Sequence, residues 1–483
     1  MFNCNNFINV NIKYNYNHFN KGMQIIMKNK RVLVVGLGIT GIASIKTLHE
    51  LGATIYAYDG QSEEKMNKTL DELKGIDVKY YFDSLDFNTD EIDLVIKSPG
   101  IKFETPIMKK LVDANLKIIG DLEAGFFVTD NKFVAITGTN GKTTTTSLIG
   151  EIINESGRKC KITGNIGSGA LYDSYISEKN ETIVVEASSF QLESTEKFKP
   201  FISIVTNLSP DHIDWHKTED NYYRAKFKIA ANQDKNDYCI LNYEDALTRN
   251  YLDLLHTNIV YFSSERVLES GIYVENMKII YNYNNEKSVI MNVDDIFIVG
   301  KHSLENVMAA CAAAKLLGID NNTIASAVKK FRGVEHRLEY FNTYNDVKFY
   351  NDSKGTNSDA SITAVKAVKA PIILIAGGYD KDSEYDEFIK AFDNKVKALI
   401  LLGQTKEKIK ECALKHGFKN IYMVENMDEA VCLSYELSEK GDTVLLSPAC
   451  ASWGMYPNYE VRGKDFKERV KFYGESRKNS KIK

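Results

Sequence analysis

The chain has 483 residues, of which 43% are hydrophobic and 26% are charged, and its formal net charge is -4. Because one domain usually holds roughly 100–200 residues, this length predicts about three domains. The hydrophobic content is sufficient for full cores and argues against a disordered chain or a membrane protein. The small net charge gives no general attraction to nucleic acid or anionic lipid, so we expect no nucleic-acid partner and no membrane insertion.

The seven cysteines include no CxxC pair and no histidine cluster at metal-ligand spacing. This usage indicates reduced thiols, as in a cytoplasmic protein. The first segment is rich in Asn, Tyr and Phe and has neither the long apolar run nor the cleavage site of a signal peptide. We therefore predict that residues 1–27 are an extension outside the folded protein and that translation starts at Met23 or Met27.

Apolar, strand-like runs alternate with helix-period segments from Arg31 onward, in three successive blocks. Such alternation is typical of parallel sheets covered by helices. We therefore predict an α/β protein with domains at 28–120, 121–333 and 334–483, of which the first and last are Rossmann-like. The predicted elements are strands at 31–35, 54–58, 94–96, 133–136, 182–185, 202–205, 372–375, 398–401 and 444–446, and helices at 42–51 and 306–317.

A glycine motif, Gly36-Leu37-Gly38-Ile39-Thr40-Gly41, follows the first predicted strand, and Asp59 follows the second. The backbone at Gly38 can approach a pyrophosphate closely, and the N-terminus of the next helix supplies N–H donors. The motif alone is compatible with NAD, with a different nucleotide diphosphate or with a tight packing turn. Of these three interpretations, it favours a nucleotide diphosphate other than NAD.

A second glycine motif, Thr137-Gly138-Thr139-Asn140-Gly141-Lys142-Thr143, also lies between an apolar strand and a helix. In such a turn backbone N–H groups surround phosphates, the lysine reaches the β- and γ-phosphates, and the last threonine can ligate magnesium. The motif departs from the full phosphate-loop pattern, because Ile136 occupies the position of the first glycine. It predicts that the central domain is a mononucleotide-binding ATPase domain of the P-loop type.

Carboxylates and an imidazole follow the next two strands of the central block. Glu186 ends the strand 182–185, and Asp211-His212-Ile213-Asp214 comes shortly after the strand 202–205. The carboxyl ends of parallel strands form the usual ligand edge of an open α/β sheet. Beside a phosphate loop, these side chains can bind magnesium and neutralise the charge that develops on a transferred phosphoryl group.

Several motifs, in order along the chain, resemble those of the Mur ligase family. They are Gly138-Thr139-Asn140-Gly141-Lys142-Thr143, Asp211-His212-Ile213-Asp214, His336-Arg337 and Asp352-Ser353-Lys354-Gly355-Thr356-Asn357. The last of these, with Gly377-Gly378-Tyr379-Asp380-Lys381 and Ser447-Pro448-Ala449-Cys450-Ala451-Ser452, is similar to the branch of the family that adds D-glutamate. The resemblance extends from about Lys28 to the end of the chain.

The resemblance implies that the three domains bind, in turn, a uridine nucleotide, ATP and an amino acid. It implies a cytoplasmic, monomeric ligase with two Mg²⁺ sites that adds D-glutamate to UDP-N-acetylmuramoyl-L-alanine in peptidoglycan synthesis, and so serves cell shape and division. In this family the substrate carboxylate takes the γ-phosphoryl group of ATP, and the amine then attacks the acyl phosphate. The activation is needed because phosphate leaves a carbonyl carbon far more easily than oxide does.

The resemblance also implies site residues at the matching positions. For catalysis these are Lys142, Glu186, His212 and Lys226, and for metal binding Thr143, Glu186, His212 and a carbamylated Lys226. For ATP they are Gly138, Thr139, Asn140, Gly141, Lys142, Thr143, Thr144, Asn306, Arg337 and Asp352. For the UDP-sugar they are Gly38, Ile39, Thr40, Asp59, Ser98 and Asn165, and for D-glutamate His212, Lys354, Thr356, Lys381, Ser452 and Tyr459. From residue type alone, Lys226 would be a solvated surface lysine.

Three alternatives remain open at this stage. Another ligase of the family would add L-alanine, a diamino acid, a D-alanyl dipeptide, or glutamate to folate, and the Asp352-Ser353-Lys354 motif argues against these. An NAD-dependent oxidoreductase would bind nicotinamide and turn over no ATP. A regulatory phosphate-loop protein would bind nucleotide but release no phosphate when an acceptor is added.

Overall fold

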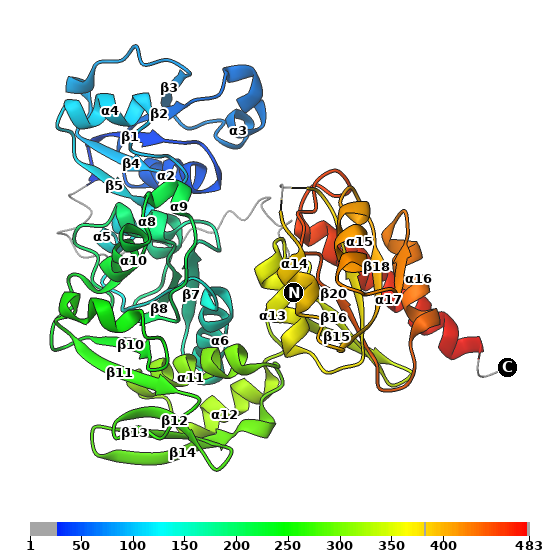
Figure 1. Cartoon of the computed structure of the whole chain (residues 1–483). Helices are drawn as coiled ribbons and strands as arrows, with labels where there is room; N and C mark the ends of the chain where they lie inside the picture. The colour runs from blue at the N-terminus through cyan, green and yellow to red at the C-terminus, as the bar shows by residue number, and fades with distance from the viewer. Residues whose placement is uncertain (1–26, 381–382, 481–483) are drawn as a thin grey trace.

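A computed structural model of the chain describes residues 27–380 and 383–480. Figure 1 shows three α/β bodies, coloured blue to cyan, cyan to green, and yellow to red, and each contains one sheet. The predicted three-domain α/β class is confirmed. Most of the predicted N-terminal extension and Lys381 lie outside the described residues. Met27 is buried in the core of the first domain and is therefore part of the folded protein.

The first domain contains a five-stranded parallel sheet in the order β3-β2-β1-β4-β5. β1 is apolar along most of its length because helices and loops cover both faces of a parallel sheet. Its elements are β1 (Arg31–Val35), α2 (Ile39–Glu50), β2 (Thr54–Asp59), η1 (Glu63–Met66), α3 (Asn67–Glu72), β3 (Val78–Phe82), η2 (Thr89–Glu91), β4 (Leu94–Lys97), α4 (Pro106–Asp113) and β5 (Ile118–Gly120).

The central domain contains a nine-stranded sheet in the order β14-β13-β12-β11-β10-β9-β6-β8-β7. Its strands are parallel from β7 to β12, while β13 and β14 add an antiparallel extension at one edge. The elements that surround the nucleotide loop are α5 (Asp121–Phe127), β6 (Phe133–Thr137), α6 (Lys142–Glu155), β7 (Cys160–Gly164), α7 (Ala170–Tyr175), β8 (Thr182–Glu186), α8 (Ser189–Glu193), β9 (Ile202–Val205), α9 (Ile213–His216) and α10 (Glu219–Phe227).

The remainder of the central domain completes the sheet and packs two helices against it. The alanine-rich helix α11 is almost fully buried because its small side chains fit closely between α6 and the sheet. These elements are η3 (Lys228–Ala230), β10 (Tyr238–Asn242), η4 (Thr248–Leu254), β11 (Asn258–Ser263), β12 (Gly271–Glu275), β13 (Lys278–Tyr283), β14 (Glu286–Asn292), η5 (Val293–Asp295), α11 (Lys301–Leu316) and α12 (Asn321–Lys330).

The third domain contains a six-stranded sheet in the order β15-β16-β20-β17-β18-β19, in which only the edge strand β15 is antiparallel. Its elements are β15 (Glu339–Tyr344), β16 (Val347–Asn351), α13 (Ser358–Ala367), β17 (Ile372–Ala376), α14 (Asp386–Lys390), β18 (Val396–Leu401), α15 (Lys406–Lys415), β19 (Ile421–Met423), α16 (Met427–Leu437), β20 (Thr443–Leu446) and α17 (Tyr459–Ser480). Within the described ranges, no helix has both the length and the apolar character needed to cross a bilayer.

The order of the strands decides which loops meet. β6 pairs with β8 on one side and β9 on the other, so the loops that follow these three strands share one edge of the central sheet. In the third domain β20 lies between β16 and β17, so Asn351, Leu446 and Ile375 stand in register just before their loops. Both sheets therefore present the motif-bearing loops at their carboxyl edges, where ligands bind in open α/β sheets.

Candidate active site

The phosphate loop of the central domain runs from the end of β6 to the start of α6. Gly138 and Gly141 adopt φ values of 138° and 84°, a region that glycine adopts at little cost. Thr139 Oγ1 donates to the carbonyl of Ser209 at 3.0 Å, and the Asn140 N–H donates to Asn207 Oδ1 at 2.9 Å. The loop after β9 thus fixes the phosphate loop, and the N–H groups of α6 form an anion site.

Two ammonium groups lie at this loop, that of Lys142 half-buried and that of Lys226 buried. Lys142 Nζ donates to the carbonyls of Gly138 and Thr139 at 2.9 Å, and Lys226 Nζ donates to the same Gly138 carbonyl at 2.8 Å. Burial lowers the pKa of Lys142 to about 8. Burial, and then the nearby charge of Lys142, lower the pKa of Lys226 well below its usual value. Lys226 is only 1% exposed, so the surface position expected from its residue type is wrong.

Glu186 ends β8 beside the phosphate loop and is 2% exposed. Its Oε1 accepts a hydrogen bond from Asn165 Nδ2 at 3.0 Å, whereas its Oε2 has no hydrogen-bond partner within the described part of the chain. A buried carboxylate oxygen that lacks a partner is costly. An oxygen of this kind fits a magnesium ligand, because hard divalent cations prefer carboxylate oxygens.

His212 immediately precedes α9 on the loop after β9. Its backbone is left-handed, with φ of 52°, and its side chain is 47% exposed. The imidazole Nε2 lies 3.5 Å from Asp211 Oδ2, and the ring lies edge-on to Phe190 with centroids 4.9 Å apart. The imidazole is therefore oriented by an aromatic contact and remains accessible to a ligand.

The third domain brings cationic and acidic groups to the same region. Arg337 Nη1 donates to Thr143 Oγ1 at 3.4 Å. Lys354 lies over the Tyr459 ring, with its Nζ 5.6 Å from the centroid. Burial lowers the pKa of Lys354, the positive charge of Arg337 lowers it further, and the negative charge of Glu186 acts in the opposite direction. Side chains of both domains therefore share one electrostatic environment.

Asp352 follows β16 and is buried. Its Oδ2 accepts from Ser447 Oγ at 2.7 Å, and its Oδ1 accepts from the Leu338 N–H at 3.0 Å. Burial raises the pKa of Asp352 to about 6. Ser447 follows β20, so this bond joins two motif loops of the third sheet. Asp352 thus fixes the loop that carries Lys354.

In the first domain, the glycine turn after β1 is held by two of the predicted site residues. Asp59 Oδ2 accepts from the Leu37 N–H at 2.8 Å, and Ser98 Oγ donates to the Gly36 carbonyl at 2.8 Å. Gly38 precedes α2, and Ile39, its first residue, is 75% exposed. The start of α2 is therefore open to a ligand, as the phosphate-binding interpretation requires.

The described part of the chain contains all of the sequence-predicted site residues except Lys381. Asn306 of α11 is buried against Gly141, where a side chain would collide with it. Thr144 is half-buried in the first turn of α6, Thr356 is half-buried, and Ser452 is buried. The ligand roles of these residues stay predictions.

Sequence reasoning missed several residues that shape the site. Lys97, at the end of β4, is buried, and its Nζ donates to the Ile101 carbonyl at 2.8 Å. Arg462 donates to the carbonyls of Ser353 and Cys450 at 2.8 and 3.1 Å. A lysine that directly follows an apolar strand was a usable signal for Lys97. Arg462 gave no signal, because its partners are distant in the sequence.

Three domain families match the chain in order. They are the Mur ligase MurD-like N-terminal domain at residues 30–120, the Mur ligase middle domain at 136–314, and the Mur ligase glutamate ligase domain at 336–450. The fold and the site thus define a ligase of the Mur type. The chain belongs to the Mur ligase family.

Similar curated proteins narrow this assignment. The UDP-N-acetylmuramoylalanine--D-glutamate ligase of Caldanaerobacter subterraneus subsp. tengcongensis is 47% identical over 92% of this chain and 98% of that protein. The protein of the same name from Clostridioides difficile is 45% identical over 92% of this chain and 99% of that protein. The similarity to the D-glutamate ligases of the family therefore extends over all three domains of this chain.

Solved structures of other Mur ligases share the fold. The UDP-N-acetylmuramate-alanine ligase of Thermotoga maritima has a TM-score of 0.57 at 20% identity and covers 92% of this chain and 100% of that one. The MurF ligase of Thermotoga maritima, solved in complex with ADP, has a TM-score of 0.57 at 14% identity and covers 95% and 100%.

Proposed function

We propose that this chain is the ATP-dependent ligase that joins the amine of D-glutamate to the carboxylate of UDP-N-acetylmuramoyl-L-alanine, a step of peptidoglycan precursor synthesis. Full-length similarity to ligases of that name supports the two substrates. The structural observation that carries the proposal is the unpaired buried oxygen of Glu186, beside Lys142 and Lys226 at the phosphate loop. The expected cytoplasmic location and monomeric state remain parts of this proposal.

The residues present fit magnesium. Thr143, Glu186, His212 and a carbamylated Lys226 would hold two Mg²⁺ ions, which supply positive charge against the phosphates and the transferred phosphoryl group. The low pKa of Lys226 supports its carbamylation, because only a neutral amine adds carbon dioxide. The product is an anion, which can ligate a cation where an ammonium cannot.

Phosphoryl transfer is the first step of the proposed reaction. A carboxylate oxygen of UDP-N-acetylmuramoyl-L-alanine forms a bond to the γ-phosphorus of ATP while the bond from that phosphorus to the β–γ bridging oxygen breaks, and ADP leaves. Lys142 and the N–H groups of α6 bind the phosphates, and Arg337 approaches them from the third domain. These groups orient the reactants and stabilise charge, which is most of what phosphoryl transfer requires from a protein.

Amide formation is the second step. The neutral amine of D-glutamate attacks the carbonyl carbon of the acyl phosphate, the tetrahedral intermediate collapses with loss of phosphate, and the nitrogen loses a proton. Lys354, Lys381, Thr356, Ser452 and Tyr459 are proposed to surround the amino acid. Cations and neutral donors suit a dicarboxylate, because a buried acid group left without a donor is strongly disfavoured.

The first test is phosphate release from ATP and Mg²⁺ with UDP-N-acetylmuramoyl-L-alanine and one of five amino acids: D-glutamate, L-glutamate, L-alanine, L-lysine or diaminopimelate. Release only with D-glutamate, and its loss in Lys142→Ala, is the expected result. Release with another amino acid would assign the chain to another step of the pathway, and no release with any of them would remove the ligase assignment.

A further inference from the structure

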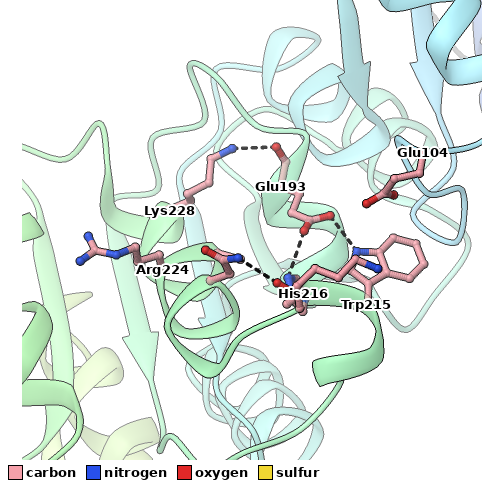
Figure 2. Close-up of a pocket in the computed structure, with 9 residues that line it drawn as sticks. Glu104, Glu193, Trp215, His216, Arg224 and Lys228 are labelled. Atoms are coloured by element: carbon pink, nitrogen blue, oxygen red, sulfur yellow. Dashed lines mark hydrogen bonds and ion pairs between the residues drawn. The ribbon is translucent and has the colours of Figure 1, made fainter.

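Glu193, the last residue of α8, holds two residues of α9 with one carboxylate. Its Oε1 lies 3.0 Å from His216 Nδ1, and its Oε2 accepts a hydrogen bond from Trp215 Nε1 at 3.0 Å. Figure 2 shows both contacts beside a cavity of about 400 Å³ that Glu104 of the first domain also lines. Successive residues of α9 are thereby attached to α8.

α9 needs such attachment, because it comprises only residues 213–216. A helix of one turn has no stability of its own. The residues at its two ends, His212 and Lys217, are left-handed with φ of 52° and 71°. A left-handed non-glycine residue is strained and persists only where the surroundings determine it. Side-chain contacts of α9 must therefore maintain the backbone of His212.

α8 and α10 make further contacts with α9. From α10, Asn221 Nδ2 donates to the His216 carbonyl at 2.9 Å, and the Tyr222 ring meets the His216 ring with centroids 5.2 Å apart. His216 Nε2 lies 3.0 Å from Ser189 Oγ, and the His216 ring stacks parallel to Phe190 with centroids 5.6 Å apart. Phe190 also meets the His212 ring edge-on at 4.9 Å. Phe190 thus contacts both imidazoles, so α8 contributes to the positions of both.

α8 follows β8, whose last residue is Glu186. The short connection, capped by Ser188 and Gln191, makes β8 and α8 one rigid unit. This unit carries Glu186 at the end of its strand and Glu193 at the end of its helix. The separation of Glu186 from His212 therefore depends on the contact of Glu193 with α9.

Trp215 also reaches the first domain. Lys102 Nζ lies 5.1 Å from the centroid of its ring, a cation–π contact. Lys102 lies in the same loop as Ser98, a predicted contact of the UDP-sugar. α9 is therefore held by the first domain, α8 and α10, and Glu193 is bound to it through two side chains.

We propose that Glu193 is a positioning residue for the ligase reaction, which by holding Trp215 and His216 fixes α9 and the orientation of His212 relative to Glu186. The inference rests on the proposed function, because that function assigns metal binding to His212 and Glu186. Glu193 acts through α9 and contacts no reacting atom.

The test compares Glu193→Ala with Glu193→Gln in the full-length protein. Mn²⁺ serves as the probe for Mg²⁺, and its binding is measured by electron paramagnetic resonance with a non-hydrolysable ATP analogue present. Glu193→Ala should weaken one Mn²⁺ site and lower kcat by about 10- to 100-fold, the usual cost of losing an outer partner of a metal ligand, while the KM for ATP changes little. Glu193→Gln should recover most of the Mn²⁺ affinity and most of kcat, because its amide oxygen accepts from Trp215 and its NH₂ donates to His216 Nδ1.

Glu196→Ala is the matched control, since this nearby glutamate is 58% exposed, and it should leave Mn²⁺ binding and kcat unchanged. The proposal is overturned if Glu193→Ala folds and binds Mn²⁺ like the parent protein, or if the folded variant loses ATP-analogue binding together with activity, which would indicate a general structural role. Trp215→Phe, which removes one of the two bonds, should give an intermediate Mn²⁺ affinity if Glu193→Ala does not fold. The proposed function is tested separately: it would be refuted if the parent protein released no phosphate in response to D-glutamate. The Mn²⁺ measurement would still show whether Glu193 positions the metal site.

Discussion

At the scale of single residues, burial changes the proton affinity of the groups that the site would use. Asp352 is held by Ser447 and by the Leu338 N–H, yet burial still raises its pKa from an ordinary 3.8 to about 6. Lys226 is affected in the opposite sense, because burial disfavours its cation. Both shifts favour the neutral form, as expected for groups removed from water.

Asp352 predicts a pH-dependent stability. Because the folded state binds this proton more tightly than the unfolded chain, the protonated carboxyl stabilises the fold at low pH, and this contribution, at most about 3 kcal/mol, is lost as the pH rises from about 4 through about 6. Asp352→Asn does not titrate, so its Tm relative to the parent should increase between pH 5 and 7 and then level off. Calorimetry over pH 5 to 8 measures the difference, and a difference that is constant with pH would contradict the assignment.

Lys226 predicts a carbamate. With ¹³C-bicarbonate at pH 8, the parent protein should show a carbamate carbon in its NMR spectrum, and Lys226→Arg should not, because an arginine side chain stays protonated. The control is Lys228→Arg, two residues along the chain, which should retain the signal. Retention of the signal in Lys226→Arg would move the modification to another lysine.

At the scale of elements, helices that approach closely use glycine to do so. Gly125 lies inside α5, and a Cβ there would lie 2.6 Å from the Ala170 carbonyl oxygen at the start of α7. The Ala170 carbonyl oxygen belongs to the backbone and therefore has little room to move. α5 is also the first helix after β5, so its contact with α7 contributes to the junction of the first two domains.

Gly125→Ala is therefore expected to destabilise the protein. Alanine favours a helix by about 1 kcal/mol over glycine, but overpacking against backbone costs about 1–3 kcal/mol, and the clash should prevail. The Tm should fall by a few degrees, measured by circular dichroism. Glu151→Ala at an exposed position of α6 should leave the Tm nearly unchanged. An increase in Tm for Gly125→Ala would mean that α5 and α7 can separate at no cost.

At the scale of the whole molecule, the site combines side chains of separate domains. The phosphate loop belongs to the central sheet and Lys354 to the third, while Arg337 contacts Thr143 through one long hydrogen bond of 3.4 Å. Contacts of this kind between domains are readily remade, so relative motion of the domains is expected. Figure 1 shows the third domain as a body distinct from the other two.

Ligand binding should therefore make the molecule more compact. With a non-hydrolysable ATP analogue, Mg²⁺ and the UDP-sugar, the radius of gyration from small-angle X-ray scattering should decrease, because ligands that contact two domains favour the closed arrangement. Lys142→Ala, which lacks the ammonium group proposed to bind the phosphates, should show a smaller decrease. An unchanged radius at saturating ligand would indicate a rigid arrangement of the domains.

Much of the fold could be predicted from the sequence, because strand and helix periodicity is local information. The strands at 31–35 and 202–205 were predicted with the bounds that the structure has, and the three-domain class is correct. β13 and β14 were not predicted, since their place at the edge depends on the pairing of β13 with β12 and of β14 with β13 rather than on an apolar run. The resemblance supplied the site positions, because motif spacing is also local.

The sequence by itself determined the glycine turns, the loop motifs and the family, since each depends on neighbouring residues or on similarity along the chain. Only the tertiary structure decided that Lys226 is buried, that one oxygen of Glu186 lacks a partner among the residues described, and that Glu193 holds α9. Burial and hydrogen bonding depend on residues that are distant in the chain, and these contacts, more than residue type, set charge and geometry at the site.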